Sequence, residues 1–119
     1  MEEIVDVKIT REDGVAVVAF KASSISDVEG IATASKHIKD FIDENQPIRL
    51  IFDFSRVKFF SSLVLGVLLE IRSKLASYNG EVAISAINPQ LHKVFKITNL
   101  DKIFTFFPDK EAAVSGVSN

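Results

Sequence analysis

The distribution of hydrophobic and polar residues predicts strands at the beginning and in the middle of the chain. Residues 4–10 mix β-branched and polar side chains, and the turn pair Asp13-Gly14 separates them from the apolar residues 15–20. This pattern is typical of a β-hairpin. Residues 48–54 are nearly all apolar. A strand of that composition indicates the centre of a sheet, where both faces are covered.

Apolar residues with helical spacing follow these strands. Between residues 27 and 43 they recur every three or four positions after a candidate N-cap at Ser26 or Asp27, which predicts a helix with one buried face. A second helix is predicted over residues 62–78, and a third over residues 89–97.

Two further strands and a terminal helix complete the pattern. Residues 81–86 and 101–107 are predicted to be strands, and residues 109–114 a short helix. A hairpin followed by alternating strands and helices implies an α/β fold with a mixed four- to five-stranded sheet and helices packed on it. We expect a single domain over residues 1–119, with a core of about residues 4–114.

The composition limits the possible functions. Of the 119 residues, 47% are hydrophobic and 25% are charged, as in ordinary soluble proteins. The formal net charge of −2 provides no basic field for a nucleic-acid backbone. The start of the chain is acidic and lacks a signal-peptide pattern, and the longest apolar run, residues 63–69, is too short for a membrane span. We therefore expect a cytoplasmic protein without nucleic-acid or membrane partners.

Metal, cofactor and catalytic chemistry find little support in the sequence. The chain has no cysteine, which excludes disulfides and thiolate ligands. His37 and His92 stand alone, without the spacing of a metal site. Glycine-rich phosphate loops and nucleophile motifs are missing as well. We therefore expect no metal, no cofactor and no enzymatic activity.

The strongest candidate for chemistry lies between the central strand and the second helix. Ser61 and Ser62 precede a long apolar run, and a serine hydroxyl at a helix start can accept a hydrogen bond from a free backbone N–H group. The same N–H groups and the helix dipole favour a bound phosphate. Ser62 is therefore a candidate N-cap and a candidate phosphorylation site, and Ser61 is the alternative for either role.

The beginning of the second helix carries more apolar residues than one buried face can hold. The run contains Leu63, Val64, Leu65, Val67, Leu68, Leu69 and Ile71. Because a helix on a sheet buries one stripe, some of these side chains must be exposed or covered by a partner. We expect Leu63 and Val64, together with Ser61, to form a partner-binding surface. The alternative is that the loop of residues 21–26 covers them.

Two blocks of sequence carry a family resemblance. The central strand ends in Asp53-Phe54-Ser55, and a connector with Val57 and Phe59-Phe60 leads to Ser61-Ser62-Leu63-Val64-Leu65-Gly66. Further along stand Asn88-Pro89, Val94, Thr98-Asn99-Leu100 and Asp101-Lys102-Ile103-Phe104. In this order and spacing the motifs resemble the STAS domain, and within it the anti-sigma-factor antagonists of bacteria. The resemblance covers roughly residues 4–114 and implies the STAS fold.

The resemblance also implies roles for single residues. The phosphorylatable serine of the family falls on Ser62, and Asp53, Ser55 and Gly66 match structural residues near that site. In the family, a serine kinase that is also an anti-sigma factor binds the unphosphorylated domain and later phosphorylates it. The phosphorylated domain releases the kinase, and a phosphatase resets the switch.

The chain departs from the family pattern next to the serine. Ser61 stands where the family has aspartate, Leu63 where it has a small residue, and Val64 where it has glycine. The leading hypothesis is a protein-interaction switch that binds an anti-sigma kinase or a related regulator. A non-phosphorylated structural module of a signalling assembly, able to form a homodimer, is the first alternative, and a small-ligand-sensing STAS domain is the second.

Overall fold

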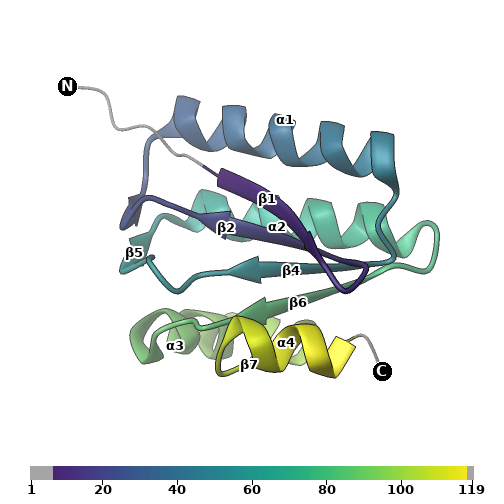
Figure 1. Cartoon of the computed structure of the whole chain (residues 1–119). Coiled ribbons are helices and arrows are strands. Elements are labelled where there is room, and N and C mark those ends of the chain that lie inside the picture. Colours follow the sequence, from purple (N-terminus) through teal and green to yellow (C-terminus); the bar gives the residue numbers. More distant parts are fainter. Residues whose placement is uncertain (1–6, 118–119) are drawn as a thin grey trace.

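The computed structural model describes residues 7–117, and the statements below concern these residues. Five strands form a mixed sheet in the order β1-β2-β4-β6-β7 (Figure 1). Their bounds are Val7–Glu12 for β1, Val15–Phe20 for β2, Arg49–Asp53 for β4, Glu81–Ser85 for β6 and Thr105–Phe107 for β7. β1 pairs antiparallel with β2, and the other neighbours are parallel. The predicted mixed α/β fold is thus confirmed, with β4 as its middle strand.

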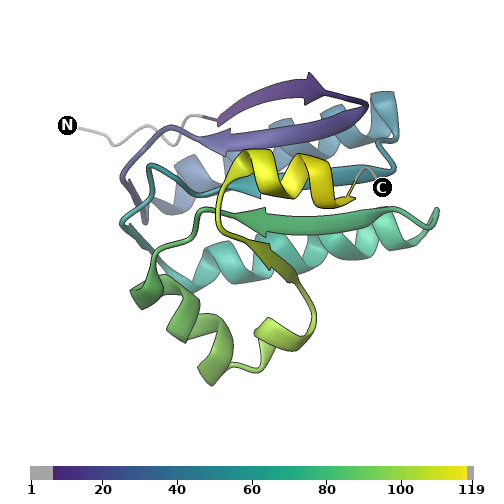
Figure 2. The same cartoon turned by 60° about the horizontal axis from the view of Figure 1, so that its bottom comes forward.

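Helices cover both faces of this sheet. The described residues form α1 (Val28–Asn45), α2 (Ser62–Ala76), α3 (Pro89–Ile97), the 3-10 helix η1 (Leu100–Lys102) and α4 (Lys110–Val117). α1 and α2 lie side by side on one face, and α4 lies on the other (Figures 1 and 2). α3 and η1 lie beyond the edge formed by β6 and β7 (Figure 2). No helix within residues 7–117 combines the length and the apolar character needed to cross a membrane.

The middle strand has a buried side chain toward each face. Leu50 and Phe52 belong to the large core under α1 and α2, whereas Ile51 packs with Ala113 and Val114 of α4. Successive side chains of a strand point to opposite faces, so an unbroken apolar run requires cover on both sides. The composition of β4 therefore predicts its central place correctly.

Several predicted boundaries need correction. α1 continues to Asn45, beyond the predicted end at residue 43, and stops at Gln46, which has a left-handed backbone with φ of 43°. The strand predicted over residues 101–107 is shorter, because Asn99 is also left-handed and η1 follows it. The first predicted strand extends to Glu12, and its residues 4–6 lie outside the described part of the chain.

Candidate functional site

The connector between β4 and α2 is fixed by a small second sheet. Its last residues form β5 (Phe59–Phe60), which pairs in parallel with β3 (Ser24–Ile25) in the loop after β2. The N–H groups of Lys58 and Phe59 donate to the carbonyl oxygen of Ser23 at 2.7 and 3.1 Å. The N–H of Ser61 donates to the carbonyl oxygen of Ile25 at 2.9 Å. The start of α2 is therefore held by backbone contacts with the loop of residues 21–26.

Asn88 holds the same connector from the opposite side. Its side-chain oxygen accepts a hydrogen bond from the N–H of Leu91 at 2.9 Å and so caps α3. Its side-chain nitrogen donates to the carbonyl oxygens of Val57 at 3.2 Å and Lys58 at 3.4 Å. Sequence reasoning identified Asn88-Pro89 as a helix start and as a family motif, but this second role was missed, because no local pattern links it to a connector so far away in the chain.

The two serines occupy different environments at the start of α2. Ser61 is the N-cap residue, with an extended backbone, but its side chain makes no capping bond within the described structure. Its Oγ atom is buried and lacks a hydrogen-bond partner there. Ser62 is the first residue of the helix and is exposed. Ser61 rather than Ser62 thus takes the cap position, and Ser62 remains accessible beside the free N–H groups of the first turn.

Leu63 and Val64 also point in different directions. Leu63 is 48% exposed, whereas Val64 is 2% exposed and belongs to the large core. The expectation that Val64 would contribute to a partner surface is therefore wrong. Val64 shares the sheet-facing stripe of α2 with Leu68, Ile71 and Leu75, one helical turn or more apart.

The loop after β2 accounts for part of this burial. Ile25 of β3 is itself buried, and it lines one tight cavity together with Phe20 and Val64. The alternative that the loop of residues 21–26 covers apolar side chains at the start of α2 is thus correct for Val64. It does not apply to Leu63, which stays half-exposed.

A groove runs between α1 and α2 and begins at Ser62. Its volume is about 790 Å³. It is lined by Val28, Ile31, Ala32, Ser35, Lys36, Lys39, Asp40 and Asp43 of α1 and by Ser62, Leu63, Gly66, Val67, Glu70 and Lys74 of α2. At the Ser62 end, Val28 is 65% exposed and faces the same groove as Leu63. We refer to Val28 and Leu63 as the apolar rim.

Asp53 and Ser55 have a structural role near the connector. The Oδ1 atom of Asp53 accepts a hydrogen bond from the N–H of Ser55 at 3.1 Å and so shapes the turn after β4. Asp53 lines a hollow with Lys21 and Lys110, whereas Ser62 lines the α1–α2 groove. The structure therefore brings Ser62, Leu63 and Gly66 together and leaves Asp53 in a different hollow.

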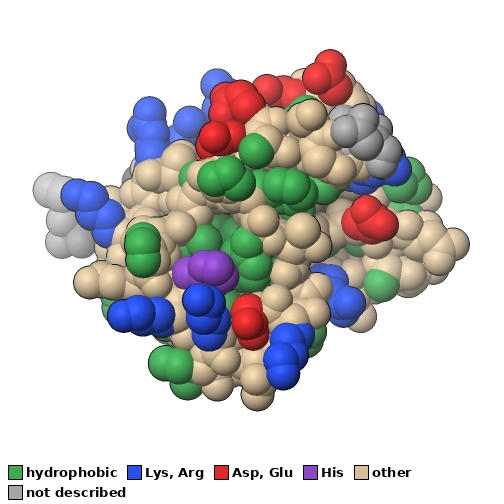
Figure 3. All heavy atoms as spheres, turned by 90° about the horizontal axis from the view of Figure 1, so that it is seen from below, with side chains coloured by type: hydrophobic (Ala, Val, Ile, Leu, Met, Phe, Trp, Pro, Cys, Tyr) green, Lys and Arg blue, Asp and Glu red, His purple; other side chains and the backbone are tan. Residues whose placement is uncertain are grey.

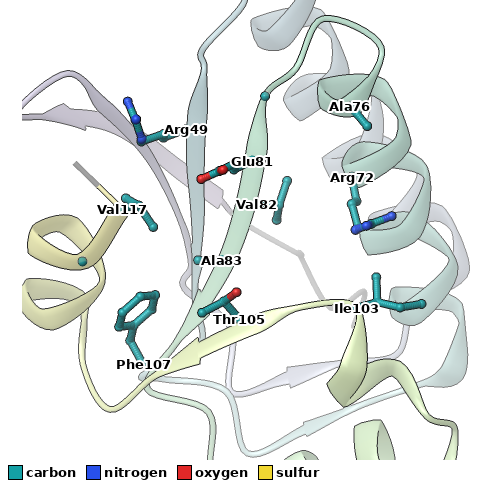
Figure 4. Close-up of a pocket in the computed structure, with 12 residues that line it drawn as sticks. Arg49, Arg72, Ala76, Glu81, Val82, Ala83, Ile103, Thr105, Phe107 and Val117 are labelled. Atoms are coloured by element: carbon teal, nitrogen blue, oxygen red, sulfur yellow. The ribbon is translucent and has the colours of Figure 1, made fainter. Parts of the chain in front are cut away.

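A second pocket, of about 440 Å³, lies around the first residues of β6, before the part of the strand that pairs with β7 (Figure 4). Arg49 of β4 and Arg72 of α2 both line it, and their guanidinium groups point away from each other (Figure 4). The Nε atom of Arg49 is buried without a hydrogen-bond partner among the described residues. Because the two cations diverge, the pocket does not form a clamp for a single anion.

The surface of α3 and η1 is basic. Lys93, Lys96 and Lys102 are exposed there, and basic side chains gather over these two elements in Figure 3. Ile97, at the end of α3, is 81% exposed. This surface lies outside the α1–α2 groove and includes none of the residues predicted for the site.

Comparison with known proteins gives consistent matches. The model of the STAS domain matches residues 6–113. A candidate anti-sigma factor antagonist of Bordetella bronchiseptica, named BtrV, is 30% identical over 67 residues, which are 56% of this chain and 58% of that protein. The alignment thus spans little more than half the length of this curated relative.

Solved structures agree with this match. An anti-sigma factor antagonist from Mycobacterium paratuberculosis has a TM-score of 0.84 at 26% identity, covering 97% of this chain and 95% of its own. The cell fate determinant SpoIIAA of Bacillus, solved in its phosphorylated form, has a TM-score of 0.72 at 19% identity, covering 94% and 99%. At that identity the second likeness concerns the fold alone.

Proposed function

The chain belongs to the STAS domain family, and we propose that it acts as an anti-sigma-factor antagonist whose binding is switched by phosphorylation of Ser62. Its partner is an anti-sigma factor that is also a serine kinase, and a phosphatase restores the unmodified state. The names of the similar proteins from Bordetella bronchiseptica and Mycobacterium paratuberculosis support the general role.

One observation carries the proposal. Ser62, which matches the phosphorylatable serine of the family pattern, is exposed at the first position of α2 and lies next to the half-exposed Leu63. A kinase can reach such a hydroxyl without opening the fold. A partner that covers Leu63 must also cover Ser62, so modification and binding compete for one surface.

The physical basis of the switch is the different effect of a phosphate on the free protein and on the complex. A phosphoserine carries about −1.5 to −2 charges at pH 7. In the free protein, the N–H groups and dipole of the helix start stabilise that charge. In the complex, the charge would lie beside the apolar rim of Val28 and Leu63, from which water is removed. The phosphate therefore weakens binding to the partner, while the fold of the free protein is maintained.

A second candidate, a non-phosphorylated structural module, is favoured by one departure from the family pattern. Ser61 stands where the family has aspartate, so this chain has no carboxylate directly before Ser62. The Oγ atom of Ser61 is buried as well and is not available to a kinase. In this alternative the apolar rim binds its partner constitutively, or binds a second copy of the chain.

The test uses the purified anti-sigma kinase of the native cell with ATP, followed by peptide mapping and calorimetric titration. We expect phosphate on Ser62, none on a Ser62→Ala variant, and an unchanged phosphorylation rate for a Ser61→Ala control. Ser62→Asp should keep the parent melting temperature and weaken binding. Phosphate found only on other residues, or none from a kinase that is active on another substrate, would favour the structural module.

A further inference from the structure

The α1–α2 groove has two unlike halves. At the far end from Ser62, ion pairs cross between the helices, from Lys39 to Glu70 and from Lys74 to Asp43 at 2.6 Å. At the Ser62 end, the walls are the apolar rim and Gly66, and a Cβ added at Gly66 would meet no atom of the described structure within 4 Å beyond its chain neighbours and the adjacent backbone of its own helix. The groove is therefore open there because α2 presents no side chain at Gly66.

The charges of the groove restrict what can bind in it. The charged side chains that line it are Lys36, Lys39, Asp40, Asp43, Glu70 and Lys74. Each of them has an opposite partner among these same residues. These pairs are solvent-exposed and individually weak. A charged occupant would nevertheless find no unpaired opposite charge among the residues that line the groove, and losing water without gaining a partner is costly. An apolar occupant leaves the pairs intact and covers the rim.

The exposure of the walls favours a protein segment over a small molecule. Ala32 and Gly66 are exposed on the two helices, and so are both residues of the apolar rim. A small apolar molecule would leave much of its own surface in water, whereas ligand sites usually enclose their ligands. A helix or loop of a larger protein can cover the open side as well, as in other helix-in-groove complexes.

We infer that the α1–α2 groove receives an apolar segment of the anti-sigma partner, which packs against Gly66 between the residues of the apolar rim. The inference rests on the proposed function and adds the place and chemistry of the contact. Ser62 is one of the residues that line the groove, so a phosphate there would stand beside the bound segment.

Because the chain has no cysteine, a single introduced cysteine can report whether the partner covers its position. Gly66→Cys places a thiol in the groove, and Ala76→Cys places a matched thiol on the same helix at an exposed residue that does not line the groove and is turned away from the face of Gly66. The purified anti-sigma factor should slow maleimide alkylation of the Gly66→Cys variant by about tenfold or more and leave that of Ala76→Cys within about twofold, because thiol reactivity depends on access.

A second pair of variants tests the contact through affinity. Gly66→Leu extends into the open groove from a Cβ that has no neighbour within 4 Å outside its own stretch of helix, and it replaces a poor helix former, so its melting temperature should equal or exceed that of the parent. It should weaken binding by about tenfold or more, as expected when a central contact is blocked. Ala76→Leu adds the same side chain on an exposed part of α2 that does not line the groove and should bind like the parent.

The outcomes separate the two proposals. If the parent does not bind the anti-sigma factor at all, the proposed function fails, and the inference with it. If the parent binds and Ser62→Asp weakens binding, but the Gly66 variants remain reactive and bind normally, only the groove inference is overturned. A melting temperature raised by lauric acid in the parent but not in Gly66→Leu would assign the groove to a small apolar molecule and would also overturn it.

Discussion

Leu63 and Val64 are neighbours in sequence, and the structure predicts opposite results when each is replaced by aspartate. Val64 is 2% exposed in the large core. Val64→Asp removes roughly 2 kcal/mol of apolar burial and places a carboxylate where its desolvation costs several kcal/mol more. The total, about 5 kcal/mol or more, is comparable to the whole free energy of unfolding of a small domain. We expect this variant to be largely unfolded.

Leu63→Asp should be mild by comparison. Leu63 is 48% exposed, so the change removes only about 1 kcal/mol of apolar burial. The new carboxylate lies in the first turn of α2, where the helix dipole stabilises a negative charge by roughly 0.5 kcal/mol and so offsets part of this loss. The free energy of unfolding should therefore change by less than about 1 kcal/mol, while the affinity for the anti-sigma factor falls.

Urea denaturation and calorimetric titration measure the two quantities separately. Because Val64→Asp is too unstable for a full curve, Val64→Ala serves as its measurable counterpart, with an expected loss of about 2 kcal/mol from transfer and cavity terms. A large loss of stability in Leu63→Asp would show that Leu63 is a core residue, and parent-like binding by a folded Leu63→Asp would remove it from the interface. Either result refutes the assignment of these two side chains.

Three further predictions concern the supports of the site. Asn88→Ala should lower the free energy of unfolding by about 2 kcal/mol in urea denaturation, because this one side chain caps α3 and donates hydrogen bonds to two connector carbonyls. A loss no larger than that of an ordinary cap would contradict the connector role. Ser61→Ala should lower the free energy of unfolding by less than about 0.5 kcal/mol, since the Ser61 hydroxyl makes no capping bond. Asp27→Ala removes a hydrogen bond of 2.7 Å to the N–H of Gly30 in the first turn of α1 and should lower it by about 1 kcal/mol. Equal losses in the two variants would disprove this difference. Burial raises the pKa of Tyr78 above 10.0, so the stability from its neutral phenol is present below pH 10 and falls as the pH rises through the higher folded pKa. Tyr78→Phe should lose that pH dependence in thermal melts. If the melting temperature of Tyr78→Phe falls with alkaline pH as steeply as that of the parent, the burial of Tyr78 is not the cause.

Much of the fold was predictable because its signals are local. The nearly all-apolar segment of β4 identified the central strand, and the Asn88-Pro89 pair marked the start of α3 at its observed position. The motifs between Asp53 and Phe104, taken in their order and spacing, identified the family, which the match to the STAS domain confirms. Each motif is a run of a few consecutive residues, and only their order along the chain had to be added.

The missed features depend on contacts between distant segments. β3 and β5 have two residues each, too few to show a strand period, and they exist because the two segments meet in space. The burial of Val64 depends on how α2 is rotated on the sheet and on Ile25 from an earlier loop. The groove depends on the spacing of α1 and α2, which no single segment encodes.

The connector is held both by β3 and by Asn88, and this determines when the site can form during synthesis of the chain. The connector that leads to Ser62 is held by contacts between residues far apart in the chain, such as the pairing of Ser24 with Phe59 and the bonds from Asn88 to Val57 and Lys58. Non-local pairings form late in folding, and parallel strands add to this delay. A nascent chain that has not yet reached Asn88 therefore lacks one support of the connector, and the protein should engage its partner only after synthesis of most of the domain.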